Sequence, residues 1–155
     1  MVSPMNPLKW NDSDLLEDNL RFEMAQKALE DVEGVKACDY EFHLPKPSYT
    51  WNTLQHLKED FPDYTFVLLI GGDNWKLFHR WYRAEDIVKE YEMVIYPRRD
   101  SDIDRTTLPS NVTIVDTDLL DISSTIVRER IRKGEPINGM VPPAIEQLAL
   151  KYYSL

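Results

Sequence analysis

Three adjacent hydroxyl side chains stand just before the most cationic stretch of the chain. Ser123, Ser124 and Thr125 lie at a predicted helix start, and Arg128 follows Ser124 by four residues, on the same helical face. Main-chain N–H groups at a helix start bind anions, and the hydroxyls and the guanidinium add further donors. This segment therefore predicts a polyphosphate site. A Ser/Thr cap beside solvated arginines explains the same residues equally well when the segment is taken alone.

A second candidate is Asp73, which follows Gly71 and Gly72 at the end of an apolar run. The glycines allow the main chain to pass close to a ligand. The Asp73 carboxylate could accept hydrogen bonds from a ribose hydroxyl or hold a metal-bound water. A tight turn in which Asp73 caps the next helix is the simpler interpretation of this segment alone.

Residues 78–83 combine aromatic rings with basic and imidazole groups. An aromatic face can stack on a flat heterocycle, and more strongly on a cationic pyridinium. A core aromatic cluster on a short helix explains the run without any ligand, and we assign Phe78 to that core.

Two more candidates come from the first half of the chain. Thr50 follows Pro47 at a predicted helix start, whose N–H groups could receive a carboxylate. Lys9, after the turn at Pro4 and Pro7, could reach a phosphate. The simpler explanations are a Thr cap and a solvated lysine.

Alternating strands and helices would bring these segments together. Residues 65–70 are almost wholly apolar, which predicts a central parallel strand buried on both faces. Ligands of parallel sheets bind at the carboxyl ends of the strands. The pattern predicts an α/β protein with a doubly wound parallel sheet, in one domain over residues 1–155. The other predicted strands cover residues 35–44, 92–96 and 112–115, and the predicted helices cover residues 12–33, 50–59, 84–91, 124–134 and 142–153.

Composition narrows the function classes. The formal net charge of −9 argues against a nucleic-acid or anionic-membrane partner, both of which need a basic patch. A small anionic substrate needs only a local cluster of cations. The single cysteine, Cys38, excludes an intrachain disulfide, and no Cys/His spacing indicates zinc. With no signal peptide or membrane span evident, we expect a cytoplasmic protein.

Taken in order, the candidate segments resemble the bacterial nicotinate-nucleotide adenylyltransferase family, of the nucleotidyltransferase α/β phosphodiesterase superfamily. The resemblance extends over essentially the whole chain and implies a Rossmann-like sheet. Many adenylyltransferases of this fold share the phrase at residues 122–128. The phrases Pro-Ser-Tyr-Thr at residues 47–50 and Phe-His-x-Trp at residues 78–81 are more specific to the nicotinate branch. The matching phrases lie at residues 3–9, 47–54, 72–73, 78–87 and 122–128.

The resemblance implies a role for each segment at the nicotinate mononucleotide. Thr50 and Tyr82 would offer main-chain N–H groups to the nicotinate carboxylate. Trp81 would stack on the pyridinium ring, and Asp73 would lie near the riboses or Mg²⁺.

The same resemblance implies the adenylyl-transfer chemistry. The 5′-phosphate of nicotinate mononucleotide would attack the α-phosphorus of ATP in line, giving deamido-NAD and pyrophosphate for NAD biosynthesis. Catalysis would be mainly positioning and charge neutralisation, shared with Mg²⁺ bound through the phosphates. The ATP ligands would be Ser123, Ser124, Thr125 and Arg128, with Lys9 assisting.

One family phrase has no counterpart. The family opens with a strand and a glycine-rich turn carrying His-x-Gly-His, whose histidines bind ATP phosphates; the sequence contains no such phrase. We expect about 30 residues, one central strand and one helix, to be absent from the front of the domain. The chain alone is therefore expected to have impaired activity and poor stability.

Two alternatives stay open at this point. The chain could be a related adenylyltransferase acting on nicotinamide mononucleotide or phosphopantetheine. It could also be a non-catalytic nucleotide-binding remnant, as the missing phrase suggests. A homo-oligomer is compatible with each alternative.

Overall fold

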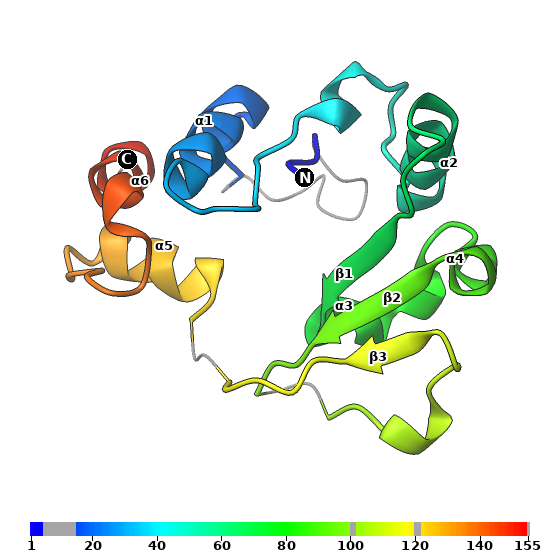
Figure 1. The fold of residues 1–155 in the computed structure, drawn as a ribbon. Helices are drawn as coiled ribbons and strands as arrows, with labels where there is room; N and C mark the ends of the chain where they lie inside the picture. Colours follow the sequence, from blue (N-terminus) through cyan, green and yellow to red (C-terminus); the bar gives the residue numbers. More distant parts are fainter. Residues whose placement is uncertain (5–14, 100–101, 120–121, 155) are drawn as a thin grey trace. The chain divides into compact units, whose positions relative to one another are not determined.

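The structure, a computed structural model, describes residues 1–4, 15–99, 102–119 and 122–154. The chain divides into two units (Figure 1). The sheet unit is Tyr49–Asp121, and the terminal unit combines Met1–Ser48 with Ile122–Leu155. Each unit is considered by itself, and the single domain over residues 1–155 stays a prediction.

A parallel sheet forms the centre of the sheet unit (Figure 1). Its strands are β1 (Val67–Gly71), β2 (Glu92–Tyr96) and β3 (Val112–Ile114), in that spatial order. Both pairings are parallel, which confirms the predicted α/β class and the strand at residues 92–96. The register aligns apolar side chains in two rows that face the core: Leu68, Met93 and Val112 in one row, and Ile70, Ile95 and Ile114 in the other.

The prediction that the first of these strands is central and buried on both faces is wrong for the sheet unit. Strand β1 is an edge strand here, with β2 as its neighbour. Leu68 and Ile70 pack into the core, whereas Val67 and Leu69 are 48% and 64% exposed. The helices of the unit contribute to the core that lies on the Leu68 face. The apolar sequence therefore indicated the strand correctly but not its position in the sheet.

Helices of the sheet unit pack on this core. They are α2 (Thr50–Asp60), α3 (Gly72–Leu77) and α4 (Ala84–Glu90), with 3₁₀ turns η3 (Phe78–Arg80) and η4 (Arg105–Thr107). Ile87, Met93 and Ile95 are almost completely buried at the centre. Phe78 is 5% exposed, which confirms its assignment to the core. Burial of an aliphatic or aromatic side chain of this kind stabilises a fold by about 1.5–3 kcal/mol.

The terminal unit is helical (Figure 1). Its elements are α1 (Asp18–Leu29), η2 (Tyr40–His43), α5 (Ser124–Arg132), η5 (Pro143–Ile145) and α6 (Glu146–Tyr153). Val127, Ile131, Ile137 and Ala149 form its core, and Met24 of α1 packs against them. Gly134 has φ +68°, a left-handed conformation that suits glycine and ends α5 as predicted.

The predicted strand at residues 35–44 is wrong. The segment is irregular up to Asp39 and then forms the 3₁₀ turn η2. Val2 N–H donates to the carbonyl of Cys38 at 2.9 Å, but isolated pairing of this kind does not make a ladder. Phe42 turns onto Phe22 of α1 with ring centroids 5.9 Å apart. Packing against α1 therefore prevails over the strand propensity of this stretch.

The long first helix is shorter than predicted. Of residues 12–33, residues 12–14 lie outside the described part of the chain, and the helix covers Asp18–Leu29. Gly34 has φ +79° in the turn beyond it. No helix within the described ranges is long and apolar enough to cross a bilayer.

Candidate active site

The carboxyl edge of the sheet carries an exposed carboxylate beside a guanidinium. Asp73 follows β1, and Arg98 follows β2 just beyond Pro97. Asp73 Oδ1 lies 3.8 Å from Arg98 Nε, and the two side chains are 63% and 41% exposed. Gly71 is the N-cap of α3, so Asp73 is a first-turn residue and not the cap. The carboxylate thus remains accessible to a ligand.

Gly71 makes room for this carboxylate. A Cβ atom added at Gly71 would lie 2.5 Å from Asp73 Oδ1, which is closer than such contacts occur. Arg98 was not among the sequence candidates. The sequence pattern that could have identified Arg98 is the same as for Asp73. Each is a charged residue directly beyond the carboxyl end of a parallel strand.

The start of α2 has no side-chain cap. Tyr49 is the N-cap, so Thr50 is the first helical residue, and the interpretation of Thr50 as a cap is wrong. The main-chain N–H groups of Thr50 and Tyr82 have no hydrogen-bond partner among the described residues. The Thr50 N–H lies at a helix start, where such a donor carries partial positive charge and suits a carboxylate.

Trp81 is held by the aromatic core. Its ring centroid lies 5.3 Å from that of Phe78, which stacks on Trp75 at 5.2 Å. Phe78 is buried, whereas the Trp81 side chain is only half-buried. One part of the indole is therefore fixed by the core while another part stays open to a ligand.

Two contacts bring the α2 start to the segment that follows Trp81. The rings of Tyr49 and Tyr82 lie 4.9 Å apart, and the Arg83 guanidinium lies 4.7 Å from the Trp51 ring centroid. Tyr49 and Trp51 are the chain neighbours of Thr50. The chain neighbours of Thr50 therefore contact Tyr82 and Arg83, so that the predicted site residues Thr50 and Tyr82 share one locality of the sheet unit.

The α5 start lies in the terminal unit and has a different character. Ser123 is the N-cap, and its Oγ accepts a hydrogen bond from Ile126 N–H at 3.2 Å. The capping interpretation is thus confirmed for Ser123. Ser124 and Thr125 are exposed, and neither hydroxyl has a partner among the described residues.

Arg128 is half-buried on the next turn of α5 and lies near Tyr153. Burial raises the pKa of the Tyr153 phenol, and the positive charges of Arg128 and Arg21 oppose that rise. Two guanidinium groups of this unit, those of Arg128 and Arg21, therefore lie within electrostatic range of the Tyr153 phenol. Lys9, the remaining candidate, lies outside the described residues.

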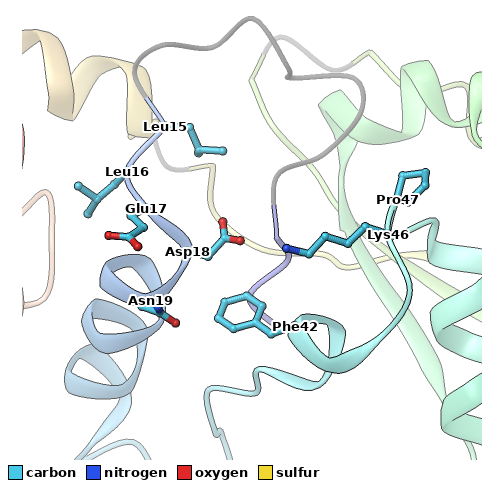
Figure 2. Close-up of a pocket in the computed structure, with 8 residues that line it drawn as sticks. All are labelled: Leu15, Leu16, Glu17, Asp18, Asn19, Phe42, Lys46 and Pro47. Carbon is cyan, nitrogen blue, oxygen red and sulfur yellow. The ribbon is translucent and has the colours of Figure 1, made fainter.

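A pocket in the terminal unit has a lining in which none of the described residues is a predicted site residue. Its volume is about 770 Å³. Figure 2 shows the Lys46 side chain extending toward Asp18 and Phe42. The wall of this pocket is formed by Leu15, Leu16, Glu17, Asp18, Asn19, Phe42, Lys46 and Pro47.

Comparison with known proteins gives a consistent family. The Cytidylyltransferase-like family model matches residues 1–130. A "Probable nicotinate-nucleotide adenylyltransferase" of Bacteroides fragilis is 43% identical over 145 residues, 94% of this chain and 72% of the relative. A protein of the same name from Flavobacterium johnsoniae is 40% identical over 147 residues, 94% of this chain and 76% of the relative.

Solved structures agree with the sequence relatives. Plasmodium falciparum nicotinic acid mononucleotide adenylyltransferase, solved in complex with NaAD, is similar with a TM-score of 0.73 and 25% identity, covering 92% of this chain and 74% of that one. A Vibrio parahaemolyticus structure shares the fold at a TM-score of 0.70 and 20% identity, covering 92% and 74%. These likenesses confirm the predicted Rossmann-like α/β fold. The chain belongs to the nicotinate-nucleotide adenylyltransferase family and is an enzyme of the nucleotidyltransferase class.

Proposed function

We propose that this chain transfers the adenylyl group of ATP to nicotinate mononucleotide, with release of pyrophosphate. The observation that carries the proposal is the locality formed by Thr50, Tyr82 and Trp81 in the sheet unit. It offers two N–H donors, neither with a partner in the part of the chain that the structure describes, beside a half-buried indole. The names of the relatives, and the NaAD held by the Plasmodium falciparum structure, support the same substrate.

The donor set favours the acid over the amide. A nicotinate carboxylate is acceptor-only, so both of its oxygens can accept from the N–H groups of Thr50 and Tyr82. A nicotinamide group would turn an NH₂ donor toward one of those N–H groups and leave it unpaired. Hydrogen-bonding sites discriminate strongly against ligands that leave such groups unpaired. Trp81 would stack on the cationic pyridinium ring.

The phosphate groups require a different part of the chain. The exposed hydroxyls of Ser124 and Thr125 and the guanidinium of Arg128 are proposed to bind the triphosphate, with Ser123 holding the helix start in place. Lys9 is proposed to neutralise charge at the reacting phosphates. Asp73 is proposed to accept a hydrogen bond from a ribose hydroxyl, because its carboxylate is exposed beside Arg98.

The adenylyl transfer itself needs no covalent enzyme intermediate. The 5′-phosphate oxygen forms a bond to the α-phosphorus as the bond to the pyrophosphate oxygen breaks. The contribution of the protein is then to align the two nucleotides and to neutralise the phosphate oxygens.

Mg²⁺ is proposed to arrive with the nucleotide. Among the described residues, no group of three or more His, Cys, Asp or Glu side chains could hold a metal ion. Mg²⁺ is commonly carried by nucleotide phosphates, and the exposed Asp73 carboxylate is available to a metal-bound water. When bound, the ion would supply charge neutralisation at the phosphates. We further propose that the reaction takes place in the cytoplasm.

Binding selectivity tests the proposal most directly. Calorimetric titration of the chain with nicotinate mononucleotide and with nicotinamide mononucleotide should show clear preference for the acid, and NaAD should compete with it. A parallel incubation with ATP, Mg²⁺ and nicotinate mononucleotide should yield NaAD and pyrophosphate, slowly because the sequence has no His-x-Gly-His phrase. Equal affinity for acid and amide, or binding of neither, would refute the proposed substrate.

A further inference from the structure

Arg83 has a left-handed backbone conformation and a side chain that contacts two other residues. It has φ +54° and ψ +39°, and it is the non-glycine residue with positive φ among the described residues. Left-handed backbone at a residue with a Cβ is unfavourable, so the surrounding contacts must maintain it. Arg83 Nε donates to Asp86 Oδ2 at 2.7 Å, while the guanidinium lies over the Trp51 ring.

These contacts join the start of α2 to the start of α4. Arg83 is the N-cap of α4 and directly follows Tyr82. Trp51 directly follows Thr50, and its ring also meets Tyr91 edge-on with centroids 6.4 Å apart. Arg83 follows Tyr82 and Trp51 follows Thr50. The contact between Arg83 and Trp51 therefore connects the chain neighbours of the two N–H groups that are proposed to donate to the nicotinate carboxylate.

We infer that Arg83 is a positioning residue that sets the separation between the Thr50 and Tyr82 N–H groups. This inference rests on the proposed function. The Tyr49–Tyr82 ring contact fixes one side of Thr50, and the Arg83–Trp51 contact fixes the other side. With only one of these contacts, the α2 start could pivot, and both donors would no longer meet one carboxylate.

A second cationic link between the same helices offers a matched control. Lys58 Nζ of α2 lies 2.7 Å from Glu90 Oε1 of α4. This pair also joins α2 to α4, but at the far end of α2, about two helical turns from Thr50. If any α2–α4 link were enough to hold the donors, loss of Lys58 would have the same consequence as loss of Arg83.

The decisive variant is Arg83→Gly, with Lys58→Ala as its control. Glycine adopts positive φ without strain, so the variant should fold with unchanged or higher thermal stability. Calorimetry should show nicotinate mononucleotide binding weakened roughly tenfold. The reason is that one N–H donor moves out of place, and its charge-assisted hydrogen bond to the nicotinate carboxylate is lost. Affinity for nicotinamide mononucleotide should change less than about twofold. Arg83→Lys, which keeps a cation near Trp51, should recover part of the affinity.

An NMR readout reports the positioning without any ligand. The Thr50 amide resonance should shift in Arg83→Gly, although the two residues are distant in sequence, and should stay in place in Lys58→Ala. Arg83→Asn, which also tolerates left-handed backbone, serves as a second variant should the glycine chain unfold.

Three results would overturn the inference. One is an Arg83→Gly chain that binds nicotinate mononucleotide as tightly as the unaltered chain, with an unmoved Thr50 resonance. Another is an equal loss of affinity in Lys58→Ala. The third is a failure of the unaltered chain to bind the acid selectively, which removes the proposed function as well; in the first two cases the proposed function stands.

Discussion

The starts of α2 and α5 offer the same physical feature, and we propose that they use it toward different ligands. Both expose main-chain N–H groups that favour anions. At α2, Tyr49, Tyr82 and Trp81 surround donors that lack a side-chain cap. At α5, Ser123 caps the helix and exposed hydroxyls precede a guanidinium. Under the proposed function, the side chains around a helix start, and not the start itself, would decide between a flat carboxylate-bearing ring and a phosphate chain.

The largest expected effect tests the proposed binding of ATP phosphates at the α5 start. Arg128→Met should weaken ATP binding by roughly ten- to a hundredfold, because a charge-assisted contact to the triphosphate is lost. Binding of nicotinate mononucleotide to the free chain should be almost unchanged. Calorimetry with each nucleotide measures both values.

Arg132→Met provides the control for that variant, since Arg132 is exposed at the end of the same helix. It should leave ATP affinity nearly intact. Similar losses in the two variants would mean that α5 attracts ATP by general charge and that the helix start has no specific role.

For the α2 start and the Trp81 ring, the comparison predicts the opposite result, in which binding of nicotinate mononucleotide is weakened and binding of ATP is not. Trp81→Ala should weaken nicotinate mononucleotide binding by about tenfold, the scale of one lost aromatic stack, while ATP affinity is retained. Trp81→Phe keeps a flat ring and should lose much less. Thermal unfolding of both variants checks the contact with Phe78. An alanine variant with full affinity for nicotinate mononucleotide would contradict the proposed stacking of Trp81 on the pyridinium ring.

Gly71→Ala should give a smaller effect. The added Cβ would press on Asp73 Oδ1, and the exposed carboxylate can rotate away, so unfolding free energy should change by about 1 kcal/mol or less. Nucleotide affinity should fall a few-fold if Asp73 contacts a ribose in the orientation seen here. Asp73→Asn, which keeps the shape without the charge, separates orientation from charge. Unchanged affinity in both variants would remove Asp73 from the site.

The smallest expected effect concerns pH and the far end of α2. The hydrogen bond from Lys58 lowers the pKa of Glu90 below its ordinary value of 4.5. A lowered folded-state pKa stabilises the protein above the unfolded value, and this contribution is lost as pH falls through the folded value. The small stability difference between the unaltered chain and Glu90→Gln should therefore be present at neutral pH, and it should disappear as pH falls through the lowered folded-state pKa of Glu90. Chemical denaturation at several pH values measures it, and a difference that persists at low pH would contradict the assignment.

Local signals predicted much of the fold. The strand at residues 92–96 ends at Pro97, and the helix from Ser124 ends before Gly134, as expected from the ordinary stop signals. Phe78 was assigned correctly to the core. The family phrases also indicated the correct family, which relatives at 43% and 40% identity confirm. The roles of the individual site residues remain proposals.

Other features depended on contacts between distant segments. Residues 35–44 have strand-like composition, yet Phe42 packs on α1 and the segment turns. The apolar run before Gly71 has the sequence pattern of a central strand. In the sheet unit it is an edge strand, because β2 is its neighbour and β3 pairs on the far side of β2. Arg98 reaches Asp73 only because β1 and β2 are paired in parallel.

The sequence by itself thus determined most of the elements, their order and the chemical types available at their ends, because propensity, capping and turn formation act between near neighbours in the chain. Tertiary structure alone decided which of those ends meet. The guanidinium of Arg83 over Trp51 and the approach of Tyr49 to Tyr82 follow from helix packing on a common core, where side-chain volume and burial over long sequence separations set the distances.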